Sequence, residues 1–361
     1  MKVLHITNLC LGYSATLPEI KLFKGLAAKG VEQTVIVHWQ TPESIELESA
    51  GIKVIYLPII KKIDFKVIWK LRMLIRTEKY DILYLTYGKA ITNGLIASWG
   101  LSVKIVSFLG SLSLYWHDPF SYSSFLNRRI DKLICICDGV EEHVLKQAPH
   151  RMKNKTIRIY FGYDPEWLKD VIPADRKNLG IPENAFVVCC VANIRKVKGV
   201  NYLIKAADLL PPNLPVWFLL VGDKSDSRAV RRNIRRTSYP DNFITIGYSK
   251  NPLSYAAICD LYIQPSLSEG LPRSVMEAMC LRKPVIVTEK GGAKELVKDG
   301  INGYVVPGKS AKAIAEKINY CYQNRDTLSE MGEKSRERII SDFSFHSMIE
   351  QTYDLFSNLL Q

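Results

Sequence analysis

Residues 261–288 read LYIQPSLSEGLPRSVMEAMCLRKPVIVT, and this stretch decides the fold. Its apolar runs predict strands over residues 261–264 and 284–288, and the apolar spacing between them predicts a helix over residues 271–279. Two short apolar strands joined by a helix are typical of a right-handed βαβ unit in a parallel sheet.

The same alternation of strands and helices extends in both directions along the chain. It predicts further strands over residues 3–7, 33–37, 54–57, 81–85, 104–108, 133–137, 157–160, 186–191, 216–221, 243–246 and 304–306. The polar stretch at 162–182, interrupted by proline and glycine, suits a linker. The fold class is therefore predicted as α/β, with two tandem Rossmann-like, doubly wound domains that face a cleft.

Charge is distributed unevenly along the 361 residues, whose net charge is +13. Residues 1–160 contain 22 basic and 13 acidic side chains, which leaves 27 basic and 23 acidic for the rest. A positive field favours nucleic acid, an anionic membrane surface or phosphorylated small molecules. No helix-turn-helix, zinc-finger, RRM or KH signature occurs, so no nucleic-acid partner is expected, although a basic nucleic-acid-binding protein is the non-enzymatic alternative.

A basic amphipathic segment at residues 61–76 concentrates part of this charge. Its apolar residues follow helical spacing, while Phe65 and Trp69 lie among lysines and arginines. This pattern predicts a helix that lies on an anionic bilayer through Lys62, Lys66 and Lys70, and the plainer alternative is a solvated basic face. We therefore expect a cytoplasmic protein, in possible peripheral contact with the inner face of the cell membrane.

The eight cysteines and the N-terminus point to the same compartment. Most cysteines lie in apolar runs, and no C-x-x-C or zinc-type Cys/His spacing occurs, so we expect buried thiols in a reducing environment. The N-terminus lacks a cleavable leader pattern, and the most apolar stretch, 91–116, is too interrupted to span a membrane.

The loop and helix inside the opening stretch contain the densest chemical signal. Gly270 allows the backbone to approach a ligand closely, and the free amides at a helix start bind anions. Glu269 precedes this helix and Glu277 lies within it, a little over two turns later. Carboxylates accept hydrogen bonds from the paired hydroxyls of sugars. Phosphate and hydroxyl recognition side by side indicate a site for a nucleotide sugar.

Glu269 and Glu277 match the E-x7-E signature of retaining glycosyltransferases of family 4, which have the GT-B fold. Five further segments, in the same order along the chain, resemble landmarks of that family: IYFGYD at 159–164, DLYIQPS at 260–266, KPVIV at 283–287, GGAKELV at 291–297 and DGINGYVV at 299–306. The E-x7-E spacing alone is weak, but six collinear landmarks are specific. The resemblance covers nearly the whole chain.

The resemblance implies roles for residues of the second half. Glu277 would bind the ribose hydroxyls of the donor, Glu269 the hydroxyls of the transferred sugar, and the amides at Gly270 and Leu271 the diphosphate. In VANIRKVKG at 191–199, Lys198 matches the family lysine on the diphosphate. Asn193 stands where the family usually has arginine, so Arg195 is expected to reach the phosphates instead. The resemblance implies no metal and no cofactor.

The first half departs more from the family. Gly12 in NLCLGYS at 8–14 is the one glycine available where the family often has two, and it is assigned to the donor. Leu109 stands where the family often has histidine, so His117 in YWHDP at 115–119 is the expected replacement. Lys89 follows a predicted strand and is assigned to an acidic acceptor. The other five histidines are expected to be structural or exposed.

These patterns predict a retaining glycosyltransferase that moves a sugar from a nucleotide-diphosphate sugar to a saccharide or lipid-linked acceptor. Residues 1–162 would bind the acceptor, residues 163–342 the donor, and a C-terminal helix at 343–361 would pack back on the first domain. Cell-surface polysaccharide or lipopolysaccharide synthesis is the expected setting. A nucleotide-sugar epimerase or phosphorylase of the same fold is the alternative enzyme.

Overall fold

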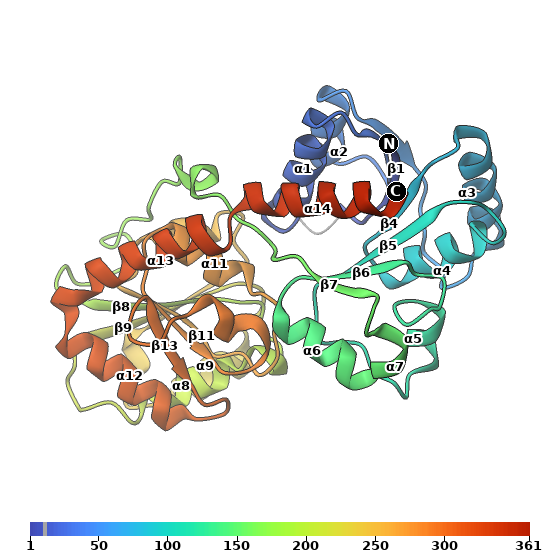
Figure 1. Ribbon diagram of the computed structural model, residues 1–361. Coiled ribbons are helices and arrows are strands. Elements are labelled where there is room, and N and C mark those ends of the chain that lie inside the picture. The colour runs from blue at the N-terminus through green and yellow to red at the C-terminus, as the bar shows by residue number, and fades with distance from the viewer. Residues whose placement is uncertain (10–12) are drawn as a thin grey trace. The chain divides into compact units, whose positions relative to one another are not determined.

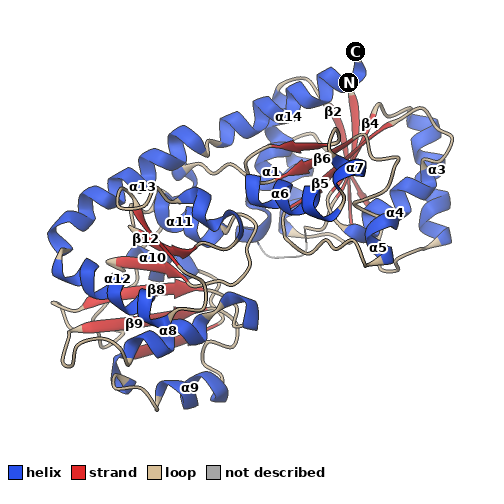
Figure 2. Cartoon of the chain, turned by 60° about the horizontal axis from the view of Figure 1, so that its bottom comes forward, coloured by secondary structure: helices blue, strands red, loops and turns tan. Residues whose placement is uncertain are grey.

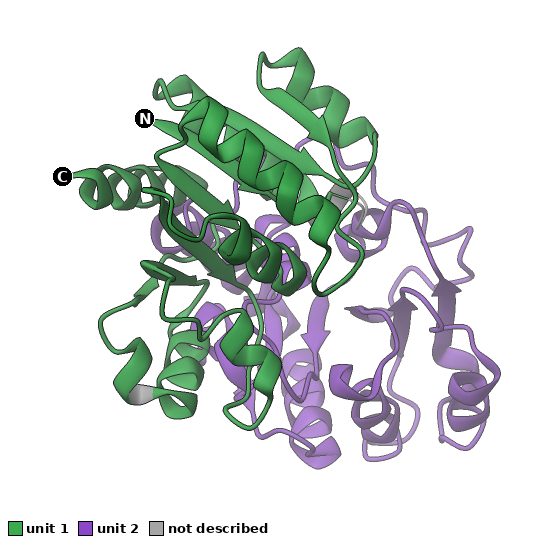
Figure 3. Ribbon diagram, turned by 90° about the vertical axis from the view of Figure 1, so that its right-hand side faces the viewer, with its two compact units in different colours: residues 1–162, 345–361 green, residues 163–344 purple. Residues whose placement is uncertain are grey.

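The computed structural model describes residues 1–9 and 13–361, which form two α/β units (Figures 1 and 3). The first unit comprises Met1–Gly162 and Phe345–Gln361, and the second comprises Tyr163–Ser344. Each unit contains one parallel sheet, with helices on both faces (Figure 2). The predicted fold class, two doubly wound α/β domains in tandem, is confirmed.

The sheet of the first unit has seven strands in the order β3-β2-β1-β4-β5-β6-β7. Their bounds are β1 Lys2–Ile6, β2 Glu32–Val37, β3 Lys53–Tyr56, β4 Ile82–Leu85, β5 Lys104–Leu109, β6 Lys132–Cys135 and β7 Thr156–Arg158. The strand order reverses between β1 and β4, which pair directly, His5 opposite Tyr84. Open sheets of this kind bind ligands at the carboxyl ends of the strands beside such a switch point.

The helices of the first unit include one that returns from the far end of the chain. They are α1 Tyr13–Ala28, α2 Pro42–Ser49, α3 Phe65–Glu78, α4 Gly88–Ala97, α5 Pro119–Ser123, α6 Asp138–Gln147, α7 Pro149–Met152 and α14 Phe345–Leu360. A Cβ added to Gly25 of α1 would lie 2.4 Å from the Ile349 side chain of α14. Lys29 Nζ also forms a salt bridge with Glu350 of α14 at 2.6 Å. The buried residues of α14 belong to the hydrophobic core of this unit, so α14 is part of the first unit.

The second unit contains a six-stranded sheet in the order β10-β9-β8-β11-β12-β13. Its strands are β8 Phe186–Val191, β9 Val216–Val221, β10 Phe243–Gly247, β11 Leu261–Gln264, β12 Val285–Thr288 and β13 Gly303–Val306. Its α-helices are α8 Val200–Ala207, α9 Arg228–Ile234, α10 Pro252–Ala257, α11 Arg273–Cys280, α12 Ala311–Gln323 and α13 Leu328–Asp342. The switch point lies between β8 and β11, where Tyr262 pairs with Cys189.

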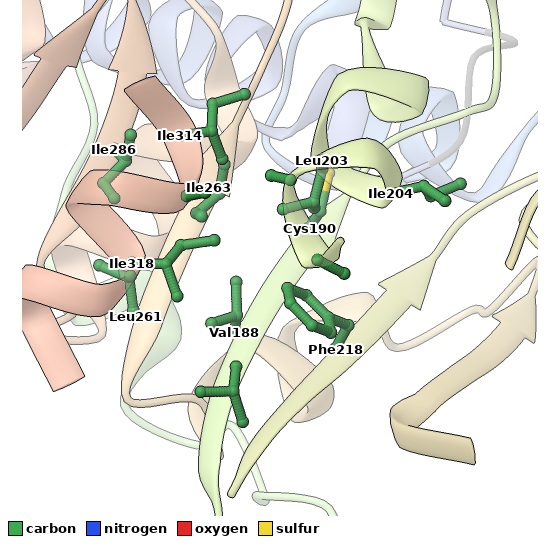
Figure 4. Close-up of a cluster of buried hydrophobic side chains, with 14 of the residues drawn as sticks. Val188, Cys190, Leu203, Ile204, Phe218, Leu261, Ile263, Ile286, Ile314 and Ile318 are labelled. Carbon is green, nitrogen blue, oxygen red and sulfur yellow. The ribbon is translucent and has the colours of Figure 1, made fainter. Parts of the chain in front are cut away.

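One face of this second sheet packs on α8 and α12 (Figure 4). Alternate strand residues such as Val188, Cys190 and Phe218 meet Leu203 of α8 and Ile318 of α12, and all are almost fully buried. The period-two pattern of each strand therefore explains which residues form this core.

Some boundaries differ from the sequence prediction. The helix expected at 271–279 begins at Arg273, with Pro272 as its N-cap, so Leu271 lies in the loop. Within the expected linker, a 3-10 turn forms at Pro165–Leu168. The seven described cysteines are all buried, as expected of small apolar residues. Among residues 1–9 and 13–361, no helix is both long and apolar enough to cross a membrane.

Candidate functional site

A buried amide at the carboxyl end of β11 organises the second unit's candidate site. Gln264 is fully buried, and its Nε2 donates to Ser266 Oγ at 2.7 Å. Its Oε1 accepts from Tyr262 Oη and from Ser274 Oγ of α11, each at 3.3 Å. Neither Gln264 nor Ser266 was predicted as a site residue. The sequence signal that could have predicted Gln264 is a polar residue at the end of an apolar strand.

Glu269 and Lys198, which are distant in sequence, form an ion pair here. Lys198 Nζ lies 2.6 Å from Glu269 Oε1, with the two side chains 20% and 12% exposed. The same carboxylate oxygen accepts from Ser266 Oγ at 2.7 Å and from Gln264 Nε2 at 3.4 Å. An ammonium and a carboxylate held at one sheet edge offer phosphate and hydroxyl recognition together.

Gly199 explains how Lys198 reaches Glu269. Its backbone is left-handed, with φ of 65°, and a Cβ there would lie 1.9 Å from the Pro265 carbonyl oxygen. The Leu267 amide also donates to the Val197 carbonyl at 2.7 Å. The loop that contains Lys198 therefore packs backbone to backbone against the loop that contains Glu269, which a side chain at 199 would prevent.

We expect Gly199→Ala to lower both stability and transferase activity. Left-handed backbone costs an alanine about 1–2 kcal/mol, and a clash with backbone adds about 1–3 kcal/mol. Gly180→Ala is the matched control, because Gly180 has φ of 71° but nothing within 4 Å of its added Cβ. Thermal unfolding should show the larger loss for Gly199→Ala, and equal losses would contradict the close-approach argument.

Asn193 and Arg195 lie on this same loop but have different surroundings. Asn193 Oδ1 accepts from the Asp223 amide at 3.1 Å, and the Ile194 amide donates to the Asp223 carbonyl at 2.8 Å. Asn193 thus fastens the loop after β8 to the loop after β9. Arg195 is exposed at the N-cap of the 3-10 turn Lys196–Lys198. Its assignment to phosphate stays a prediction.

Among the acidic side chains of the second unit, Glu277 has the most strongly shifted pKa. It is only 7% exposed on α11, and Tyr163 Oη donates to its Oε1 at 3.1 Å. Burial raises the pKa of Glu277 to about 7, while the Tyr163 hydrogen bond and the charge of Arg273 oppose that rise. Tyr163 is a partner that the sequence analysis missed, because its pairing with α11 depends on tertiary structure.

The segment between the two glutamates is also packed. Gly270 and Leu271 are both buried, and they precede the α11 start at Arg273. The Gly292 amide donates to the Glu269 carbonyl at 3.3 Å, which ties this loop to the segment after β12. The binding of a diphosphate by the amides of Gly270 and Leu271 stays a prediction.

In the first unit, the predicted site residues are exposed. His117 stacks on the Tyr115 ring at 5.4 Å between centroids, and its neighbour Asp118 caps α5 by accepting from the Phe120 amide. Lys89 is exposed in the first turn of α4, which follows β4. Gly12 lies outside the described residues.

Polar residues at the carboxyl ends of β1, β2 and β4 were not predicted as site residues. Thr7 Oγ1 donates to Glu19 at 2.6 Å and accepts from Thr86 at 3.1 Å. His38, expected to be structural or exposed, is half-buried, and its Nε2 lies 3.0 Å from Tyr87 Oη. Burial and the charge of Lys89 lower the pKa of His38. Their place at strand ends was the available signal.

No group of three or more His, Cys, Asp or Glu side chains that could hold a metal ion occurs among residues 1–9 and 13–361.

Two family models match the chain, one in each unit. The model of the glycosyl transferase 4-like domain matches residues 21–158, and the model of glycosyl transferases group 1 matches residues 171–338. This chain belongs to the family 4 glycosyltransferases of the GT-B fold. The predicted enzyme class is thereby confirmed, and neither an epimerase nor a non-enzymatic nucleic-acid-binding protein is supported.

Relatives of this family 4 glycosyltransferase include proteins of several bacteria. The N-acetyl-alpha-D-glucosaminyl L-malate synthase of Bacillus anthracis is 23% identical over 308 residues, which cover 82% of this chain and 80% of the relative. The lipopolysaccharide core biosynthesis glycosyltransferase LpsE of Rhizobium meliloti is 24% identical over 340 residues, 94% of each chain. The crystal structure of Anabaena Alr3699/HepE in complex with UDP-glucose superposes with a TM-score of 0.80 and 22% identity, covering 99% of this chain and 100% of that one.

Proposed function

We propose that this glycosyltransferase retains the anomeric configuration and transfers a sugar from a nucleotide-diphosphate sugar to a hydroxyl of a saccharide or lipid-linked acceptor. The observation that supports this best is the Lys198–Glu269 pair at the carboxyl edge of the second sheet. The Lys198 ammonium can bind a phosphate, and the adjacent Glu269 carboxylate can accept hydrogen bonds from sugar hydroxyls. This pair therefore suits the junction between a sugar and its diphosphate.

In this proposal, each charged group has a separate task. Lys198 turns from Glu269 to the diphosphate and stabilises the negative charge that develops on the leaving group. Glu269, which keeps Ser266 and Gln264 as partners, then holds hydroxyls of the transferred sugar. Glu277 accepts from the ribose hydroxyls. Lysine and backbone dipoles take the place of a metal, so we propose that transfer needs no metal ion or cofactor.

Known relatives support the donor class and the setting. The Anabaena structure contains UDP-glucose, and the Rhizobium relative is named for lipopolysaccharide core biosynthesis. We therefore infer that this chain uses a nucleotide sugar in the synthesis of a cell-surface polysaccharide or lipopolysaccharide. We also propose that it works in the cytoplasm at the inner face of the cell membrane, where a lipid-linked acceptor is available.

Thermal-shift and donor-hydrolysis measurements with UDP-, GDP- and ADP-sugars test this proposal. One donor class should raise the melting temperature, because a ligand bound only to the folded state stabilises it by mass action. Hydrolysis of that donor should proceed equally in excess EDTA and in millimolar Mg²⁺. No shift with any donor would contradict the nucleotide-sugar assignment, and loss of turnover in EDTA would contradict the metal-free account.

A further inference from the structure

The solvent-facing side of α3 is apolar at its centre, which is unusual for a surface helix. Val67, Leu71 and Ile75 are buried against the first unit. Successive helical residues turn by about 100°, so Trp69 and Met73 lie nearly opposite Leu71. Trp69 is 64% exposed and Phe65, one turn earlier, is 82% exposed. An ordinary amphipathic helix has polar residues at these positions.

Neighbouring segments extend this apolar area and hold it in place. Trp99, after α4, is 70% exposed, and Arg72 Nη1 of α3 donates to its carbonyl at 2.7 Å. The buried Asn93 accepts from the Asp64 amide at 2.8 Å and donates to the Lys62 carbonyl at 3.1 Å. The turn that leads into α3 is therefore fixed by the protein core, and the exposed side chains are presented without a folding step.

Basic residues flank the exposed apolar stripe. Residues 57–77 contain six basic side chains and one acidic one. The acidic residue, Asp64, caps α3 by accepting from the Val67 amide. Lys66, Lys70 and Arg76 are exposed on α3, whereas the Lys62 ammonium lies over the Phe120 ring at 4.3 Å. We define the α3 surface as Phe65, Lys66, Trp69, Lys70, Met73 and Arg76.

We propose that the α3 surface docks this protein on an anionic lipid bilayer. The inference rests on the proposed function in one respect: a lipid-linked acceptor would be met at that surface. Aromatic and sulfur-containing side chains at the centre would enter the headgroup region, and the flanking cations would meet anionic lipids. A nucleic-acid phosphate backbone would satisfy the cations but would leave the central apolar stripe in water. The charge pattern and the apolar centre together therefore favour a bilayer.

Cosedimentation of the full-length chain with phosphatidylcholine vesicles that contain 0 or 30% phosphatidylglycerol tests this proposal. Binding should be strong only with the anionic vesicles, and it should fall steeply between 0.1 and 1 M NaCl, as the Debye length falls from about 10 Å to about 3 Å. The triple variant Lys66→Glu/Lys70→Glu/Arg76→Glu should lose about 100-fold in partitioning, because each basic residue at an anionic surface is worth roughly fivefold. Phe65→Ser/Trp69→Ser should also weaken binding.

The chain offers a matched control in the second unit. Arg231, Arg232 and Arg235 lie exposed on or next to α9, a basic helix without an exposed large apolar residue. Arg231→Glu/Arg232→Glu/Arg235→Glu makes the same change in net charge and should leave vesicle binding within about twofold of the wild type, because α9 exposes no large apolar side chain that could enter the headgroup region.

Equal binding to neutral vesicles, an equal loss in the α9 control, or unchanged binding after Phe65→Ser/Trp69→Ser would each overturn the proposal. Thermal shifts with nucleotide sugars on the same preparations separate this inference from the proposed function. A normal donor shift without vesicle binding would reject the α3 surface alone. Vesicle binding without any donor shift would reject the donor assignment alone.

Discussion

Lys198→Met is expected to lower kcat by about 10²–10³, the usual effect of removing one electrostatic group that stabilises transition-state charge. Methionine keeps most of the side chain's length and packing, so the second unit should remain folded. The loss should appear in kcat more than in KM, because the diphosphate gains charge as the bond to the sugar breaks. Steady-state kinetics with saturating acceptor measure both constants.

Lys196→Met is the control for that experiment. Lys196 occupies the same 3-10 turn and is exposed, but it is not the partner of Glu269. It should keep kcat within a few-fold of the wild type. A comparable loss of kcat in both variants would mean that turnover depends on the total positive charge of the loop. It would contradict a specific role for Lys198, the partner of Glu269, in the reaction.

Glu277→Ala is expected to lower the rate of transfer at limiting donor concentration by about 10- to 150-fold. Loss of a charged hydrogen-bond partner of the donor costs about 1.5–3 kcal/mol, and the variant also leaves the buried Tyr163 hydroxyl unsatisfied, which costs about 1–3 kcal/mol of stability. Glu277→Gln is therefore the cleaner test, since it keeps the shape and an acceptor for Tyr163. Donor affinity, measured by calorimetry, should fall about 10- to 100-fold in Glu277→Gln.

The pH dependence of donor binding tests the same carboxyl group. Burial raises the pKa of Glu277 from 4.5 to about 7, so the neutral form is favoured in the ligand-free protein below neutral pH. Its contribution to folding stability is present below pH 4.5 and is lost as the pH rises through 7. Ribose hydroxyls prefer the carboxylate, so donor affinity should rise about tenfold from pH 6 to pH 8.

Two variants test whether Glu277 is the group that causes this pH dependence. Glu277→Gln should bind the donor with nearly the same weak affinity at both pH values. Tyr163→Phe removes the hydrogen bond that favours the carboxylate, so its profile should move to higher pH. Near-wild-type affinity in Glu277→Gln would reject the ribose assignment, and a pH-dependent Gln variant would assign the titration to another group.

The sequence by itself determined the class and order of the elements. Apolar runs such as residues 186–191 and 216–221 coincide with β8 and β9 because a strand buried on both faces tolerates few polar side chains. Element ends were harder: α11 begins two residues later than predicted, because Pro272 caps this helix and does not occupy its first turn. The E-x7-E spacing and its neighbouring landmarks also identified the family without coordinates.

Only the tertiary structure decided which polar groups meet. Lys198 and Glu269 form an ion pair because the left-handed Gly199 lets two loops touch through their backbones, and no local pattern encodes that contact. Tyr163 and Glu277 meet because α11 packs against the first residues of the second unit, and the burial that follows raises the pKa of Glu277. Periodicity reports which face of an element is apolar, whereas side-chain pairing across elements depends on packing that a single sequence does not display.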